Sequence, residues 1–136
     1  MTAVRGSCLC GGVRFEMTDE PDRISHCHCT TCKRISGGGG TVNARVRSDA
    51  IRILQGEELL RTFQPAEGSA KTFCSACGAN LFGGGWPDSE RASVRLPALE
   101  AEFEVPGAHI YVRSLAPWET LPEDGLERFD TSSGDV

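Results

Sequence analysis

The sequence predicts a mainly β fold, and three observations lead to this prediction. Short segments alternate apolar and polar residues with a period of two, as strands with one buried face do. No segment carries the longer apolar pattern of an amphipathic helix. Turn-forming residues are frequent, with Gly at 16 and Pro at 7 of the 136 positions, so we expect short strands and long loops.

The alternating segments define the expected strands in chain order. They cover residues 13–17, 42–46, 51–54 and 109–113. Single helical turns are expected at residues 29–35 and near residues 118–121. A chain of this length most simply forms one core, so residues 1–130 are predicted to be one domain and residues 131–136 a polar tail.

The charge pattern argues against nucleic acid as a partner. A protein that binds nucleic acid needs a basic face, whereas the formal net charge is −5 and Lys33-Arg34 is the only adjacent basic pair. Residues 1–5 lack the apolar region of a secretion signal, and no stretch approaches the roughly 20 apolar residues of a membrane span. We therefore expect a cytoplasmic protein without a membrane partner, whose cysteines stay reduced. The oligomeric state is not predicted.

The seven cysteines fall into three clusters. The clusters are Cys8-x-Cys10, Cys27-x-Cys29-x-x-Cys32 and Cys74-x-x-Cys77-Gly78. An odd count and C-x-C spacing suit disulfides poorly. In a strand, residues i and i+2 share a face, so the first pair can address one metal. The last pair has the spacing of a zinc knuckle, in which Gly78 can take the left-handed conformation that such turns need. The outer pairs therefore predict one four-thiolate zinc site.

The central cluster is the candidate site for chemistry. Four thiolates close the tetrahedral shell of a structural zinc, whereas three leave one position free. A histidine could close it instead, with His26, His28 and His109 as candidates, and this alternative stays open here. In an extended chain His28 would point to the face opposite its two cysteine neighbours. A zinc held by three thiolates carries a net charge of −1, so it is a poorer Lewis acid and hydrolysis by an activated water is less favoured. It can still hold an added thiol as its thiolate, because coordination deprotonates sulfur.

These residues resemble the glutathione-dependent formaldehyde-activating (GFA, or centromere-protein-V-like) family. The resemblance rests on Ser7-Cys8-Leu9-Cys10-Gly11, Cys27-His28-Cys29-x-x-Cys32-Lys33-Arg34, Phe73-Cys74-x-x-Cys77-Gly78, His109-Ile110, Ala116-Pro117-Trp118 and Asp124-Gly125-Leu126. It implies an Mss4-like fold of small antiparallel sheets around a structural zinc on Cys8, Cys10, Cys74 and Cys77. It implies a second zinc, at a site that can be partly occupied, on Cys27, Cys29 and Cys32. The implied activity is that of a carbon–sulfur lyase, which joins formaldehyde and glutathione as S-hydroxymethylglutathione.

Other residues are candidates for substrate binding and proton transfer. The carboxylates of glutathione need cations, for which Lys33, Arg34 and Arg45 are available, although surface solubility is the commoner role of such residues. His109 is the candidate for proton transfer. Trp86 and Trp118 either line a pocket or pack in the core. The alternative function is a non-catalytic zinc-binding module for protein interaction. Methionine-sulfoxide reduction would need a metal-free cysteine, and none lies outside the three clusters.

Overall fold

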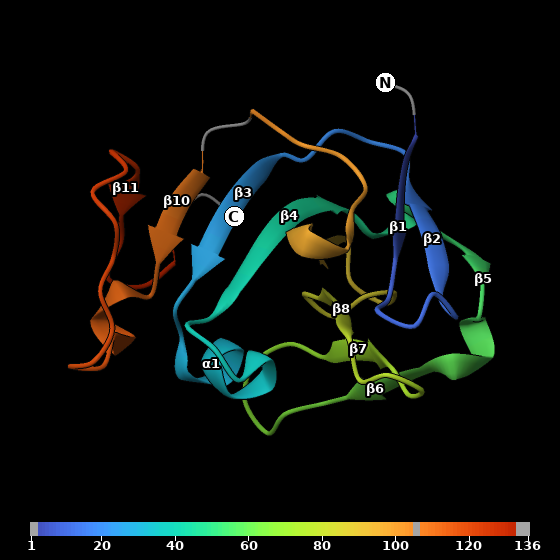
Figure 1. Ribbon diagram of the computed structural model, residues 1–136, viewed down its shortest axis with the longest axis horizontal. Coiled ribbons are helices and arrows are strands. Elements are labelled where there is room, and N and C mark those ends of the chain that lie inside the picture. The colour runs from blue at the N-terminus through green and yellow to red at the C-terminus, as the bar shows by residue number, and fades with distance from the viewer. Residues whose placement is uncertain (1–2, 105–106, 133–136) are drawn as a thin grey trace.

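The computed structural model describes residues 3–104 and 107–132, which form two β-sheets (Figure 1). The smaller sheet has the strand order β1-β2-β5 and the larger one β11-β10-β3-β4-β9-β8-β7-β6. The strands are β1 (Val4–Ser7), β2 (Arg14–Met17), β3 (Arg23–Cys27), β4 (Thr41–Arg47), β5 (Ile51–Gln55), β6 (Leu60–Phe63), β7 (Lys71–Cys74), β8 (Asn80–Gly83), β9 (Arg91–Arg95), β10 (Gly107–Ile110) and β11 (Glu127–Arg128). The one α-helix of the described residues is α1 (Thr30–Ser36).

The mainly β class is confirmed, and the larger sheet adds parallel pairs to the antiparallel ones that were expected. β10 runs parallel to both β3 and β11, whereas the other pairs in this sheet are antiparallel. The C-terminal part of the chain reaches β3 by a long connection rather than by a hairpin, and a parallel pair requires such a connection. As a result, α1 and the C-terminal segment lie on the same side of Figure 1.

The expected elements match the structure with two corrections. Three of the expected strands correspond to β2, β4 and β5, and the helical turn expected at residues 29–35 is α1. The fourth strand ends at Ile110, because Tyr111 adopts a left-handed conformation with φ 59°, which breaks the extended chain. Near residues 118–121 the described chain forms a turn rather than a helix, closed by a hydrogen bond from the Glu119 amide to the Ala116 carbonyl (2.9 Å).

The hydrophobic core lies between one face of the larger sheet and the smaller sheet. Phe15 of β2 meets Phe82 of β8 edge to face, with ring centroids 4.9 Å apart, and Val94 of β9 belongs to the same buried cluster. Because side chains alternate along a strand, the polar neighbours Ser93 and Arg95 point to the opposite face. This second face of the larger sheet is polar, and the candidate site is built on it.

The tail predicted at residues 131–136 is only partly described. The Thr131 carbonyl accepts a hydrogen bond from the Tyr111 amide (3.0 Å), which ties the chain down at this point. Residues 133–136 lie outside the described residues. Within the described ranges, no helix has both the length and the apolar character needed to cross a membrane.

Candidate metal centres and the adjoining cleft

The outer cysteine pairs come together at one four-cysteine centre. The sulfur atoms of Cys8, Cys10, Cys74 and Cys77 all lie within 4.8 Å of one another. The first pair is not in a strand, as the sequence analysis assumed, because β1 ends at Ser7. Instead, a turn through Gly11, with φ 77°, brings the Cys8 and Cys10 sulfurs to 3.6 Å. The pair therefore converges by chain reversal and not by strand alternation.

Backbone donors favour the thiolate form at this centre. The Val13 amide donates to Cys8 Sγ at 3.2 Å and the Gly12 amide to Cys10 Sγ at 3.4 Å. The Ala79 amide lowers the pKa of Cys77 to about 6. Gly78 has φ 79°, as the knuckle pattern predicted, and its amide donates to the Cys74 carbonyl at 2.7 Å. Four cysteine sulfurs within 4.8 Å of one another fit the ligand set of a closed zinc site.

The central cysteines form a second, three-membered centre at the junction of β3 and α1. Cys27 ends β3, Cys29 is the N-cap of α1, and Cys32 lies in its first turn. Their sulfurs lie within 4.8 Å of one another, and the Cys32 amide donates to Cys29 Sγ at 3.3 Å. Hydrogen bonds from Cys27 and then Cys32 lower the pKa of Cys29 to about 2. Among the described residues no histidine or carboxylate joins this group, so one tetrahedral position has no protein ligand.

The histidines lie on the other face of the sheet. His28 Nε2 is 2.9 Å from His109 Nδ1, and His109 Nε2 is 2.8 Å from an Asp124 carboxylate oxygen. His109 is only 3% exposed and its ring stacks against that of His28, with 5.1 Å between centroids. This geometry fits the expectation that His28 points away from its cysteine neighbours. The structure does not bring His109 to the thiol groups, and its role in proton transfer stays a prediction.

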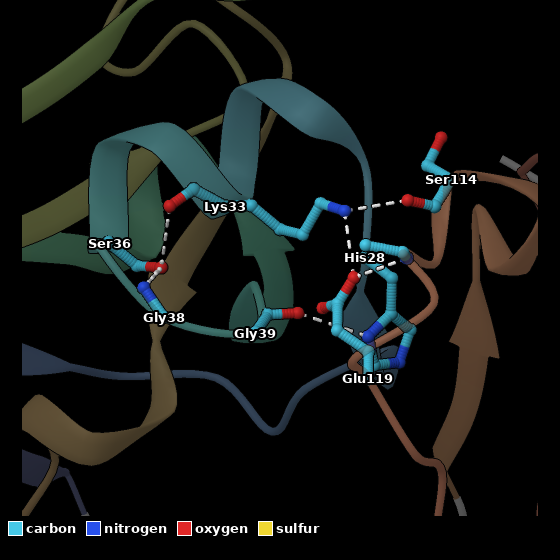
Figure 2. A network of polar contacts seen from close by, with 8 residues as sticks. His28, Lys33, Ser36, Gly38, Gly39, Ser114 and Glu119 are labelled. Atoms are coloured by element: carbon cyan, nitrogen blue, oxygen red, sulfur yellow. Dashed lines mark hydrogen bonds and ion pairs between the residues drawn. The ribbon is translucent and has the colours of Figure 1, made fainter.

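A second contact joins α1 to the C-terminal segment. Lys33 Nζ donates to the Ser114 carbonyl at 2.6 Å and pairs with Glu119 at 2.8 Å (Figure 2). On the same side, His28 Nδ1 lies 3.2 Å from the Gly39 carbonyl oxygen. Lys33 was considered above as a cation that binds substrate, but its ammonium group already contacts Ser114 and Glu119 within the fold. The ion pair braces the helix that carries Cys32 against residues far away in the chain.

The central cysteines open into a cleft of about 430 Å³. Its basic lining residues are Arg23, Arg45, Lys71 and Arg95. Of the three cations that the sequence suggested, only Arg45 lines the cleft; Lys33 and the exposed Arg34 do not. Lys71, on β7, and Arg95, on β9, were missed, because neither strand was expected from the sequence. The signal that could have found Arg95 is the alternation Arg91-Ala-Ser-Val-Arg95.

Two of these cations are buried without an acidic partner. Lys71 is 8% exposed, and its Nζ contacts the Ser69 hydroxyl at 3.2 Å. Arg95 is 6% exposed. Neither forms an ion pair with a carboxylate of the described residues. Buried charges are costly unless they are paired, so the cleft is built to receive negative charge.

The two tryptophans lie outside this cleft. Trp86 packs against Phe82, with ring centroids 4.6 Å apart, and borders the hydrophobic core. Trp118 is 85% exposed, so it does not pack in the core, and it does not line this cleft. The cleft is lined mainly by polar and cationic residues, with Tyr111 as its aromatic residue.

Comparison with known proteins gives one family. The family model described as "Glutathione-dependent formaldehyde-activating enzyme" matches residues 3–114. A Halomonas elongata protein named "Putative glutathione-dependent formaldehyde-activating enzyme" is 32% identical over 97 residues, which cover 62% of this chain and 59% of that relative. The chain thus matches less than two thirds of the relative's length. A crystal structure of a Rhodobacter sphaeroides protein has a similar fold, with a TM-score of 0.60 and 24% identity over 76% of this chain and 99% of that one. The chain therefore belongs to the glutathione-dependent formaldehyde-activating (GFA) family.

Proposed function

We propose that this protein is a zinc-dependent carbon–sulfur lyase that reversibly joins a small thiol to an aldehyde. Glutathione and formaldehyde, which give S-hydroxymethylglutathione, are the proposed pair, and the family and the named relative support them. The observation that carries the proposal is a three-thiolate centre without a fourth protein ligand, placed beside buried cations that have no acidic partner. A cytoplasmic location, where thiols stay reduced, is part of the proposal.

The donor sets fit two zinc ions per chain. Thiolate sulfurs are ligands that zinc prefers, and the first centre offers four of them while the second offers three. Zinc at the second centre would hold an incoming thiol as its thiolate at neutral pH. The protein itself supplies the remaining functions: it orients the substrate and places positive charge around it.

The charge of the cleft suits a tripeptide that carries two carboxylates. Four cationic side chains face one acidic residue, Glu67, and the single net negative charge of a zinc with three thiolates, which leaves an excess of two positive charges. Arg45 and Lys71 are the proposed partners of the two carboxylates. An electrostatic match of this kind fixes the orientation of the ligand and so places its sulfur at the cysteines. His28 and His109 do not line the cleft, so a proton passed by His109 would have to travel through solvent water.

The two zinc ions are expected to differ in affinity. The four-cysteine centre is closed and joins distant segments, whereas the three-cysteine centre has an open position through which the metal can exchange. A titration with a chelator should therefore remove the central zinc at a lower concentration than the outer one, as measured by elemental analysis of the protein fraction. Loss of both ions at a single chelator concentration would contradict this assignment.

The catalytic proposal predicts acceleration of a reaction that also occurs spontaneously. Zinc-loaded protein should speed the exchange between glutathione plus formaldehyde and S-hydroxymethylglutathione, as measured by NMR exchange spectroscopy at equilibrium. Cys29→Ser removes one ligand of the second zinc and should return the rate to the spontaneous value. A matched control is Arg34→Gln, because Arg34 lies in α1 beside this centre but is exposed and does not line the cleft. If the zinc-loaded wild-type protein gives no acceleration, the formaldehyde assignment is wrong.

A further inference from the structure

The buried side chain of Arg95 carries a hydrogen-bond donor without a partner. Among the described residues, Nη2 of Arg95 is the one buried side-chain nitrogen or oxygen that makes no hydrogen bond. The side chain is 94% buried, since only 6% of the residue is exposed. An unpaired charged donor in a protein interior costs free energy, so a native fold that contains one indicates a ligand for it.

The other two nitrogens of Arg95 hold the guanidinium group in place. Nε donates to Asn80 Oδ1 and Nη1 donates to Asn43 Oδ1. The amide nitrogen of Asn43 donates to the Thr41 hydroxyl at 3.0 Å, which turns the Asn43 oxygen toward Arg95. A Cβ on Gly83 would lie 3.0 Å from Nη2, and because glycine has none, no side chain of this residue covers the donor. The planar guanidinium group is thus held in place while its Nη2 has no hydrogen-bond partner.

Strand register places Arg95 on the face of the sheet that carries the central cysteines. Arg95 of β9 lies opposite Asn43 of β4, which lies opposite Ser25 of β3. Cys27 follows Ser25 by two residues and therefore shares its face. The bonds to Asn43 of β4 and Asn80 of β8 hold the guanidinium between the two neighbouring strands, and Arg95 lines the cleft together with all three cysteines. Burial lowers the pKa of Arg95, and the thiolates of Cys32, Cys27 and Cys29 act against that shift.

We propose that Arg95 is a catalytic residue whose Nη2 binds the oxygen nearest to the reacting sulfur, an assignment that rests on the function proposed above. The carboxylates of glutathione lie several bonds from its sulfur and meet the cations Arg45 and Lys71. Arg95 lines the same cleft as the three cysteines and, among the described residues, carries the buried donor without a partner. The oxygen of an added aldehyde is separated from the sulfur by one carbon, and this position suits a donor held beside the cysteines.

The reaction step gives this donor a defined task. A sulfur lone pair forms the carbon–sulfur bond, and the π pair of the carbonyl moves to oxygen as a negative charge. The Nη2 proton binds the charged oxygen more strongly than the neutral carbonyl, so it stabilises the transition state. The oxygen then takes a proton from water, and the proton of the original thiol has passed to solvent. In the reverse direction, the same donor stabilises the alkoxide that expels the thiolate.

Binding measurements with two ligands test the position of Nη2. The probes are glutathione and glutathione sulfonate, which carries oxygens directly on its sulfur. In calorimetry with zinc-loaded protein, Arg95→Gln should weaken binding of the sulfonate at least about tenfold, the effect of losing a charged donor. The affinity for glutathione itself should change by less than about threefold, because the oxygen is absent from this ligand. Arg91→Gln is the matched control: Arg91 is on the same strand but pairs with Asp22 at 3.0 Å and does not line the cleft.

Catalytic activity provides a second measurement, and its outcomes separate a failure of this proposal from a failure of the proposed function. Arg95→Gln should slow the catalysed exchange about 100-fold at full zinc content, as is typical when one oxyanion donor is lost. Equal weakening of both ligands would assign Arg95 to a carboxylate and overturn the proposal, as would unchanged binding of the sulfonate. If wild-type protein binds neither ligand, the proposed function itself fails. Arg95→Lys keeps the positive charge but not the planar guanidinium fork. Like Arg95→Gln, it should weaken binding of the sulfonate more than binding of glutathione. In wild-type protein the Arg95 guanidinium NMR signal should shift with the sulfonate and not with glutathione, a measurement that needs no variant.

Discussion

Replacing Cys74 by serine is expected to unfold the whole domain. This fully buried residue joins the end of β7 to Cys8 and Cys10, which lie more than sixty positions earlier in the chain. Binding of a structural zinc contributes on the order of 10 kcal/mol to folding in zinc-finger peptides. That value is comparable to the entire stability of a typical domain, about 5–15 kcal/mol. The substitution removes a ligand of that zinc and leaves a polar hydroxyl in the core.

The matched variant is Cys29→Ser, which alters the other centre. Cys29 is half-buried at the start of α1, and its centre is formed by residues within one short segment. We expect this variant to stay folded with one zinc per chain, while Cys74→Ser loses its thermal transition. Thermal melts followed by circular dichroism, together with elemental analysis of each variant, provide the comparison. Equal collapse of the two variants would mean that the central zinc is structural as well.

The second large effect is expected at Gly40. Its φ is 137°, and a Cβ there would lie 2.1 Å from the Cys27 carbonyl oxygen and 3.3 Å from the His28 Cα. Because these are backbone atoms, they cannot rotate away as a flexible side chain could. Gly40→Ala should reduce the free energy of unfolding by about 3 kcal/mol or more, since left-handed strain and displacement of a packed segment both contribute. It should also weaken zinc binding at the second centre, because the displaced segment carries Cys27.

Gly37→Ala provides the control for backbone strain alone. Gly37 ends α1 with φ 72°, and a Cβ there would meet nothing within 4 Å. The expected loss is only about 1 kcal/mol, with both zinc ions retained. Urea denaturation gives the two free energies, and zinc counts on the folded proteins give the metal affinities. Similar losses in both variants would show that close approach to Cys27 has no separate effect.

The parts of the site that depend on neighbours in sequence were predictable. The spacing within 27–32 is short enough that a strand end and one helical turn bring three sulfurs together. Gly78 was expected to be left-handed from the knuckle pattern alone, and its φ of 79° agrees. For Cys8 and Cys10 the prediction was correct in one respect and wrong in another. The two sulfurs do converge, but through a glycine turn and not through the alternation of side chains along a strand. Strand alternation and a glycine turn both bring residues i and i+2 together, so spacing does not separate them.

The parts that depend on distant pairing were not predictable. The parallel return of β10 beside β3 has no local signature, yet it carries His109 to His28. Along β9, the apolar residues face the core, and the opposite face carries Arg91 and Arg95. A strand face of that composition is usually exposed to solvent. Here other residues cover part of that face, so that Arg95 is buried while Arg91 is not, and the difference arises only in the tertiary structure.

The position of the cysteines along the chain has a consequence for synthesis at the ribosome. Five of the seven cysteines emerge before Cys74, and these five include the complete central cluster but only half of the outer one. A nascent chain in the presence of zinc therefore offers three sulfurs of one centre and two of the other before the correct four-cysteine set exists. Ser114, Glu119 and Asp124, whose contacts with Lys33 and His109 support this region, are synthesised later still. Metal supplied during translation and metal added to a finished chain thus meet different ligand sets, and the timing of zinc delivery decides which sulfurs bind it first.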